Sequence, residues 1–122
     1  MPPSVTVLTN GAGQASAYVV RVRADGSQSV ESLDGGVRMG DATDRMFLVL
    51  YARGVGSPNT AEVTAVVGCL TARASYAGPS GDGGVDQVNL ELPRELGSMH
   101  GNLQLQLRVA SRASAQVTVP FA

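Results

Sequence analysis

The sequence contains two strand-like stretches that decide the expected fold, Phe47-Leu-Val-Leu-Tyr-Ala-Arg-Gly-Val-Gly56 and Gly84-Val-Asp-Gln-Val-Asn-Leu-Glu-Leu-Pro93. Each consists mainly of residues that favour β-strands and ends at glycine or proline, which interrupt strands. The first stretch shows no polar alternation, which is typical of a strand buried on both faces. The second alternates apolar and polar residues, which is typical of a strand with one face toward water. Together they predict an all-β domain.

Further strands are expected on both sides of these two. The two stretches themselves predict strands over 45–52 and 87–92, and similar patterns predict strands over 5–8, 17–23, 27–33, 62–67, 70–77, 103–109 and 115–121. Asp25-Gly26 is a strong two-residue hairpin signal, and Gly68 separates a second pair of strands. Residues 34–44 are glycine-rich and acidic and are expected to form a loop. The only helical candidate is a single turn over 93–97.

Short strands separated by 15 glycines and 6 prolines favour a sandwich. We therefore expect an all-β fold, an immunoglobulin-like antiparallel β-sandwich of about seven to nine strands. The likeness is architectural, because the chain has one cysteine and no tryptophan. The length of 122 residues predicts one domain over 1–122. The last strand is expected at a sheet edge, where another chain can pair with it.

Charge and hydropathy exclude several function classes. Nine arginines stand against ten acidic residues, without the clustering that a nucleic-acid partner requires. No apolar stretch approaches the roughly 20 residues of a membrane-spanning helix. Met1-Pro-Pro-Ser lacks the features of a signal peptide. The alternatives are a cytoplasmic protein and an excised module whose export signal lies elsewhere, and we favour the second. Cys69 lies in an apolar run and is expected to be a small buried residue.

One glycine-rich loop is a candidate calcium site. Ser80-Gly-Asp-Gly-Gly-Val-Asp86 places the carboxylates of Asp82 and Asp86 in a stretch whose backbone carbonyls are accessible, and Asp41 and Asp44 lie in another loop. Calcium prefers oxygen ligands of this kind, although the spacing of an EF-hand is not matched. The alternative is structural: Asp82 stabilises a turn, and Asp86 opens a strand with its carboxylate bonded to local backbone N–H groups.

Few residues suit catalysis or sugar binding. His100 is the only histidine, and no nucleophile-elbow motif accompanies it, so we expect no catalytic residues and no cofactor. Tyr76 lies near a loop and is the one candidate for an exposed aromatic platform. Tyr18 and Tyr51 lie within strands and are expected in the core. The low aromatic content argues against a strong carbohydrate-binding module.

Several blocks of the chain together resemble a bacterial family, the Solibacter-type uncharacterized C-terminal domain of acidobacterial secreted proteins. They are Leu48-Val-Leu-Tyr-Ala-Arg-Gly-Val-Gly56, Val63-Thr-Ala-Val-Val-Gly68, Tyr76-Ala-Gly78, Gly84-Val-Asp-Gln-Val-Asn-Leu-Glu-Leu-Pro93 and Val117-Thr-Val119. Tyr18-Val-Val-Arg-Val-Arg-Ala-Asp-Gly26 is similar to the family's lead-in segment. The chain departs from the family at Gly68-Cys-Leu-Thr-Ala72. The resemblance implies lead-in strands and a loop over 1–44 and a family core over 45–122.

The resemblance implies an extracellular or cell-surface module joined to upstream domains of a larger secreted protein. The family carries no activity that transfers to residues. We therefore expect a non-catalytic structural spacer, or an adhesion or protein-interaction domain. The alternative is a small polysaccharide- or calcium-binding module that uses the Asp82–Asp86 loop and Tyr76. Ligand-dependent thermal stability distinguishes the two hypotheses, because a ligand that binds only the folded chain stabilises it.

Overall fold

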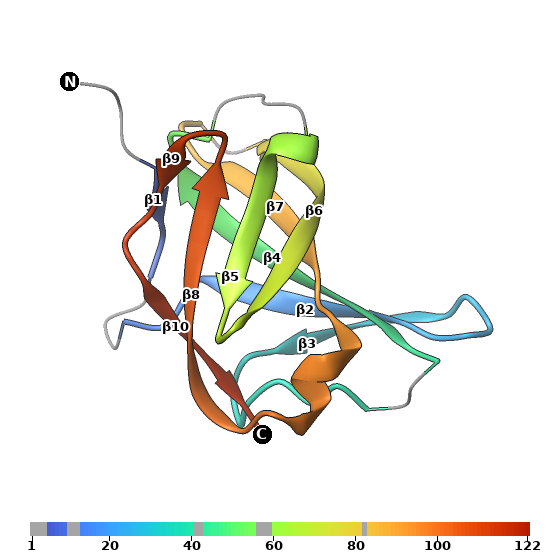
Figure 1. Cartoon of the computed structure of the whole chain (residues 1–122). Coiled ribbons are helices and arrows are strands. Elements are labelled where there is room, and N and C mark those ends of the chain that lie inside the picture. The colour runs from blue at the N-terminus through green and yellow to red at the C-terminus, as the bar shows by residue number, and fades with distance from the viewer. Residues whose placement is uncertain (1–4, 10–12, 41–42, 56–59, 82) are drawn as a thin grey trace.

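The computed structural model describes residues 5–9, 13–40, 43–55, 60–81 and 83–122. These residues form ten strands and two short 3₁₀ helices (Figure 1). The strands are β1 (Thr6–Val7), β2 (Ala17–Val22), β3 (Gln28–Ser32), β4 (Arg45–Arg53), β5 (Val63–Val67), β6 (Leu70–Pro79), β7 (Asp86–Glu91), β8 (Gly101–Val109), β9 (Arg112–Ala113) and β10 (Val117–Phe121). The 3₁₀ helices are η1 (Thr60–Glu62) and η2 (Arg94–Ser98). The nine expected strands are confirmed, and the two-residue β9 adds a tenth.

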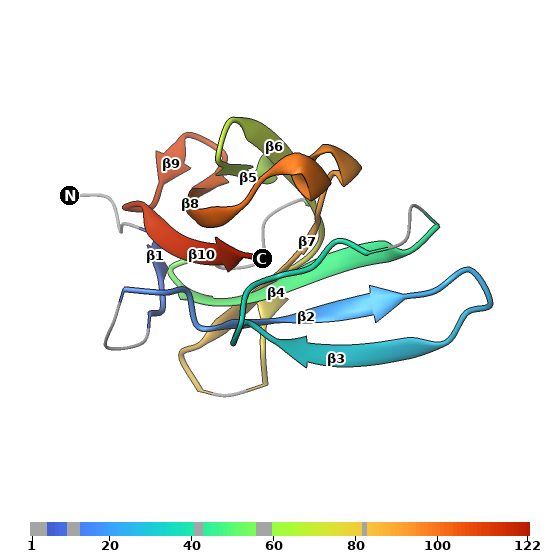
Figure 2. The ribbon, with the colours of Figure 1, turned by 90° about the horizontal axis from the view of Figure 1, so that it is seen from below.

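The strands pair antiparallel in the order β10-β8-β5-β6-β7-β4-β2-β3, with β1 on β4 and β9 on β8. Because this long sheet twists and folds back on itself, its two halves face each other. Figure 2 shows β5, β8 and β10 on one side of the interior and β4, β2 and β3 on the other, with β7 turning between them. The expected all-β, sandwich-like antiparallel fold is therefore confirmed.

The core lies between these two halves. Its fully buried side chains come from alternate positions on the facing strands: Met46, Leu48, Leu50, Val63, Val67, Val88, Leu90, Leu105 and Leu107. On β4, Val49 points to the opposite face and is also only 2% exposed. The expectation that this strand is buried on both faces therefore holds at its centre. No helix in the described part of the chain is long and apolar enough to cross a membrane.

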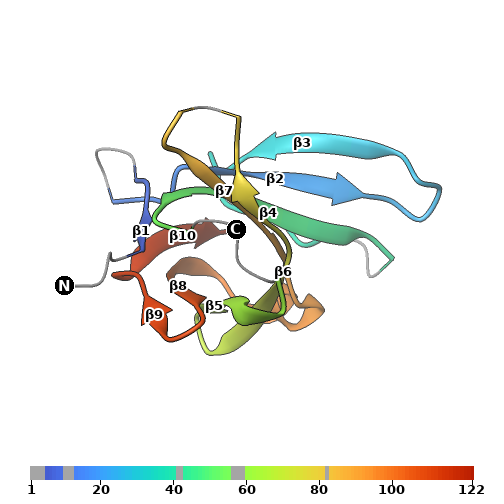
Figure 3. The ribbon, with the colours of Figure 1, turned by 90° about the horizontal axis from the view of Figure 1, so that it is seen from above.

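The two ends of the strand order differ in their outer edges. β10 lies at one end of the strand order, as expected, but its outer edge is not open to another chain. Thr118 exchanges backbone hydrogen bonds with Gly13 and Ala15, and Val37 bonds to Pro120 and Ala122. Two segments distant in sequence thus cover the outer side of β10. At the other end, β3 pairs only with β2 among the described residues. Figure 3 shows β3 at the margin of the molecule, so the open edge is there.

Two hairpin turns follow the sequence signals, and one of them corrects an expectation. Asp25 accepts a hydrogen bond from the backbone N–H of Ser27, and Gly26 adopts a φ of 89° between β2 and β3. Gly68 adopts a φ of 61° between β5 and β6. Its neighbour Cys69 is exposed, although we expected it to be buried. The reason is that Gly68 and Cys69 form the two-residue turn itself, so the apolar run around them is not one continuous strand.

Strand β2 turns an unexpected face to the interior. Its side chains alternate between the two faces: Val19 and Arg21 are buried, whereas Tyr18, Val20 and Val22 lie on the outer face. Arg21 donates to both carboxylate oxygens of Glu31, from Nε at 2.7 Å and from Nη2 at 3.1 Å, and its Nη1 donates to Asp44 at 2.9 Å. Two backbone carbonyls of the loop before β4 accept its remaining N–H groups. All N–H groups of the buried guanidinium are therefore paired, and these bonds offset the free-energy cost of burying its charge.

The Arg21–Glu31 pair predicts a dependence of stability on pH. Hydrogen bonds from Arg21 hold the pKa of Glu31 below its ordinary value, against the opposing effect of partial burial. A carboxyl with a lowered folded-state pKa stabilises the fold above its unfolded pKa, and this contribution disappears as the pH falls through the folded pKa. We expect the free energy of unfolding to decrease on acidification, and to decrease less steeply in Glu31→Gln. Urea unfolding between about pH 6 and about pH 3 measures both slopes, and equal slopes would contradict the assignment.

Candidate functional site

The outer face of the sheet carries one continuous row of side chains. Directly paired residues in an antiparallel sheet point to the same side. The strand register places Val30, Val20, Phe47, Glu91, Arg73, Thr64 and Arg108 opposite one another in turn, across seven strands. The row begins at the open edge of β3 with three apolar side chains and continues with charged and polar ones. We call it the outer row.

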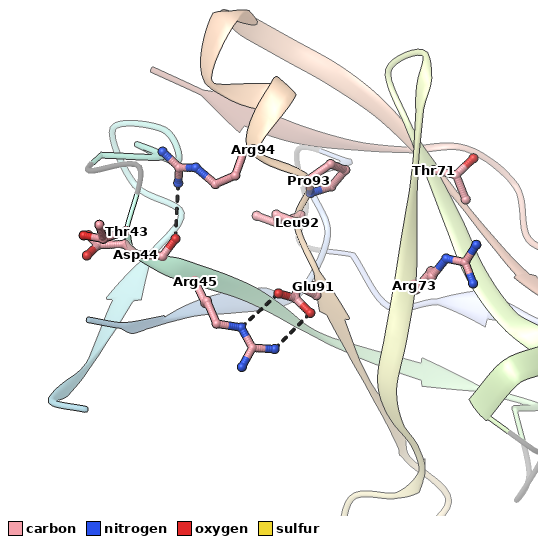
Figure 4. A pocket seen from close by; sticks show the side chains of 9 residues that line it. All are labelled: Thr43, Asp44, Arg45, Thr71, Arg73, Glu91, Leu92, Pro93 and Arg94. Carbon is pink, nitrogen blue, oxygen red and sulfur yellow. Dashed lines mark hydrogen bonds and ion pairs between the residues drawn. The ribbon is translucent and has the colours of Figure 1, made fainter. Parts of the chain in front are cut away.

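The outer row passes a cleft of about 360 Å³. The cleft is lined by Thr43, Asp44, Arg45, Thr71, Arg73, Glu91, Leu92, Pro93 and Arg94, which Figure 4 shows as sticks. A volume of this size matches the lower range of ligand pockets in proteins. The lining joins the start of β4, the end of β7 and the first part of β6.

Pro93 explains why a hollow forms at this point. The pairing of β7 with both neighbours stops at Glu91, and the backbone N–H of Leu92 makes a last hydrogen bond of 2.8 Å to Met46. Proline has no N–H to continue the ladder and favours the extended φ of −64° from which the chain turns into η2. β4 and β6 continue beyond this point, so a gap remains between them.

Cations dominate the cleft. Its lining contains three arginines and two carboxylates, in a chain whose net charge is −1. Arg45 binds both carboxylate oxygens of Glu91, at 3.0 and 3.1 Å, and its guanidinium lies 5.1 Å from the ring centre of Phe47. Asp44 turns its carboxylate toward Arg21. Both acidic groups of the cleft are therefore already neutralised by arginine.

The other two arginines of the cleft differ from each other. Arg94 donates to the backbone carbonyls of Met39, Asp44 and Gly40, which fixes its guanidinium against the loop before β4. Arg73 is exposed, and no described residue forms a hydrogen bond or an ion pair with its side chain. It pairs across the strands with Glu91, whose oxygens both belong to Arg45. Arg73 is therefore the arginine of the cleft whose N–H donors are available to a ligand.

The structure separates the residues predicted for calcium. Asp86 opens β7, and its Oδ2 accepts a hydrogen bond of 2.9 Å from the backbone N–H of Val55. This bond joins the start of β7 to the residues that follow β4, which are distant in sequence. Asp82 and Asp41 lie outside the described residues. Within the described ranges, no three His, Cys, Asp or Glu side chains gather where a metal ion would fit. The calcium hypothesis stays a prediction.

The aromatic predictions are partly corrected. Tyr76 is 40% exposed on β6, as expected, and its hydroxyl donates a hydrogen bond of 2.7 Å to the carbonyl of Pro79. Tyr18 and Tyr51 were expected in the core, which is wrong. They are half-buried on the outer face, with ring centres 6.2 Å apart. The alternation that placed Val19 inward explains the error for Tyr18, because neighbouring side chains of a strand point in opposite directions.

The sequence analysis did not find the cleft. Its arginines come from three separate segments, and only the strand pairing brings them together. The signal that was available is Pro93, two residues after the charged Glu91 at the end of an alternating strand. His100 is placed elsewhere, with Nδ1 2.8 Å from the carbonyl of Ala122. No family model, curated protein or solved structure matches the chain. The resemblance to the Solibacter-type family therefore stays a prediction.

Proposed function

We infer that this chain is a non-catalytic interaction module of a larger secreted or cell-surface protein, and that it binds a partner polypeptide with the outer face of its sheet. One observation supports this above the others. Val30 is 70% exposed in the middle of β3, an edge strand with no second neighbour among the described residues. Large apolar side chains on an open strand edge are unfavourable in a protein that acts alone, because they invite association.

The surroundings of Val30 suit a protein partner. Val20 and Phe47 continue the outer row inward from it and are half-buried, so a contiguous apolar strip leads from the open edge toward the cleft. An extended segment of a partner can pair with β3 through its backbone while its side chains contact this strip. A spacer without partners has no need of such a strip. The secreted or cell-surface setting rests on the family resemblance.

Capture experiments with Val30→Glu test the proposal. Immobilised chain, wild type or variant, is incubated with secreted and surface proteins of the source organism, and bound proteins are quantified by mass spectrometry. We expect a defined set to bind wild type and to be lost with the variant. Because Val30 is largely exposed, the variant should keep the wild-type unfolding temperature. Equal retention by both proteins would contradict the assignment to this surface.

The alternative module is tested with the same preparation. Calcium, EDTA and soluble polysaccharides are added in turn, and thermal unfolding is recorded. A midpoint increase of several degrees with one additive, lost in Asp86→Ala or Tyr76→Ala, would favour the calcium or polysaccharide hypothesis by mass action. The observation that supports this alternative is the partial exposure of the Tyr76 side chain, which could contact a sugar ring.

A further inference from the structure

We propose that the cleft at the end of β7 is a carboxylate-binding site, and that it recognises an acidic segment of the partner polypeptide, with Arg73 as its main anchor. The proposal rests on the proposed function, since it specifies which partner chemistry the outer face accepts. The partner then makes two contacts. Its apolar side chains pack on the apolar strip, and its glutamate or aspartate side chains bind in the cleft.

Among the three arginines of the cleft, the existing hydrogen bonds indicate Arg73 as the one that can bind a ligand. Arg94 is held by three backbone carbonyls, and Arg45 is held by both oxygens of Glu91. Arg73 keeps five N–H donors in a planar fork, the geometry that binds a carboxylate through two parallel hydrogen bonds. The internal Arg45–Glu91 pair shows the same two-bond contact one strand away. A second carboxylate on Arg73 would place two such pairs side by side on the sheet.

Thr71 supplies a further donor beside Arg73. It is exposed and lines the cleft two residues earlier on β6, where the pairing with β7 has already ended. Thr71 and Arg73 are two residues apart on one strand, so their side chains lie on the same face of β6. Hydrogen bonds from a hydroxyl and a guanidinium to one carboxylate are stronger than bonds between neutral groups, because the acceptor is charged.

Charge supports an anionic ligand. The positive excess of the cleft lies in a chain that is slightly negative overall, and Arg108 extends it along the outer row beyond Thr64. A localised patch of sign opposite to that of the whole molecule attracts a ligand of complementary charge and orients it during association. Such attraction weakens as salt screens the exposed charges.

The neighbouring apolar strip favours a polypeptide over an acidic polysaccharide. Phe47 and Val20 adjoin the charged part of the outer row, and the chain is only 4% aromatic. The apolar side chains of this strip bury apolar side chains of a peptide well, whereas sugars expose hydroxyl groups that such a surface leaves unpaired. A segment with apolar residues followed by acidic ones matches the outer row in order, from Val30 to Arg73.

Binding of synthetic peptides to the full chain tests the proposal. The probe has valines in its first half and glutamates in its second. One control peptide carries glutamine for glutamate, and another carries serine for valine. Titrations followed by NMR are expected to shift the signals of Thr71, Arg73 and Phe47 with the probe. Both control peptides should bind more weakly, and added salt should weaken the binding of the probe.

The variants Arg73→Gln and Arg53→Gln separate a specific site from general attraction. Each removes one positive charge, and Arg53 lies on β4 at the end opposite Arg45, where it bonds to the carbonyl of Gly84. We expect about tenfold weaker binding of the probe for Arg73→Gln, the size of a lost charge-assisted hydrogen bond, and little change for Arg53→Gln. Equal effects of the two variants, or no detectable binding, would overturn the proposal.

Two further arms identify the source of the anionic group. Inorganic phosphate or oligogalacturonate that binds as tightly as the peptide probe would show a general anion site and overturn the assignment to acidic polypeptides. The capture experiment with wild type and Val30→Glu is carried out independently of these probes. If the Val30-dependent partners persist while the acidic peptide fails to bind, this proposal is wrong and the interaction module stands. If neither Val30-dependent partners nor binding of the acidic peptide is found, both the carboxylate site and the interaction module are contradicted.

Discussion

Replacing Arg21 with alanine is expected to lower the free energy of unfolding by about 3 kcal/mol. The side chain of Arg21 is 10% exposed and is paired with Glu31 and with Asp44, whose side chain is 12% exposed. Removing the cation leaves the Asp44 carboxylate nearly buried without its counter-ion. The backbone carbonyl of Arg38 loses its hydrogen bond from Arg21, whereas that of Met39 keeps the one from Arg94. Breaking a buried ion pair on one side costs about 3–5 kcal/mol, and the partial exposure of Glu31 places this site at the lower end.

Arg45→Ala is the matched control for Arg21→Ala. Arg45 also forms an arginine–glutamate pair, with Glu91 at 3.0 Å, but the two side chains are 62% and 43% exposed. Exposed ion pairs contribute about 0–1 kcal/mol. Chemical denaturation of both variants therefore compares one kind of contact at two degrees of burial. Similar losses in the two variants would show that Arg21 does not act as a buried cation.

The Arg21 cluster also illustrates what sequence patterns do not contain. The period of two in residues 17–23 correctly predicted a strand with two faces. It assigned no burial, and the more apolar face, with Val20 and Val22, lies outward. Arg21 points inward because its counter-ions come from β3 and from the residue before β4. Such compensation depends on pairing between distant segments, which a local pattern does not record.

The elements themselves were largely predictable, because strands and turns depend on neighbouring residues. The hairpin at Asp25-Gly26 and the end of β7 at Pro93 follow local backbone preferences. The cleft was not predictable in the same way, since its lining comes from β4, β6 and β7. Arg73 looked like any exposed arginine of a strand, and only its register opposite Glu91 sets it apart. The covering of the β10 edge was not predicted either, because it also depends on segments that are distant in sequence.

That covered edge gives the second large effect, in the variant Gly36→Ala. Gly36 adopts a φ of 91°, and a Cβ at this position would lie 2.6 Å from the backbone nitrogen of Ala122. The next residue, Val37, carries the two hydrogen bonds that attach this loop to β10. We expect the variant to lose about 3 kcal/mol, of which about 1–2 kcal/mol comes from the left-handed backbone and the rest from displacement of the loop and β10.

Gly35→Ala isolates the contribution of that contact. Gly35 has nearly the same backbone conformation, with a φ of 79°, but no atom lies within 4 Å of the Cβ it would gain. Its substitution should therefore cost only the backbone strain, about 1–2 kcal/mol. Urea unfolding gives the difference between the two variants, and hydrogen exchange at Val37 and Ala122 should accelerate only in Gly36→Ala, because only that change loosens their pairing. Indistinguishable unfolding curves would mean that the loop does not close against the C-terminal end of β10 in solution.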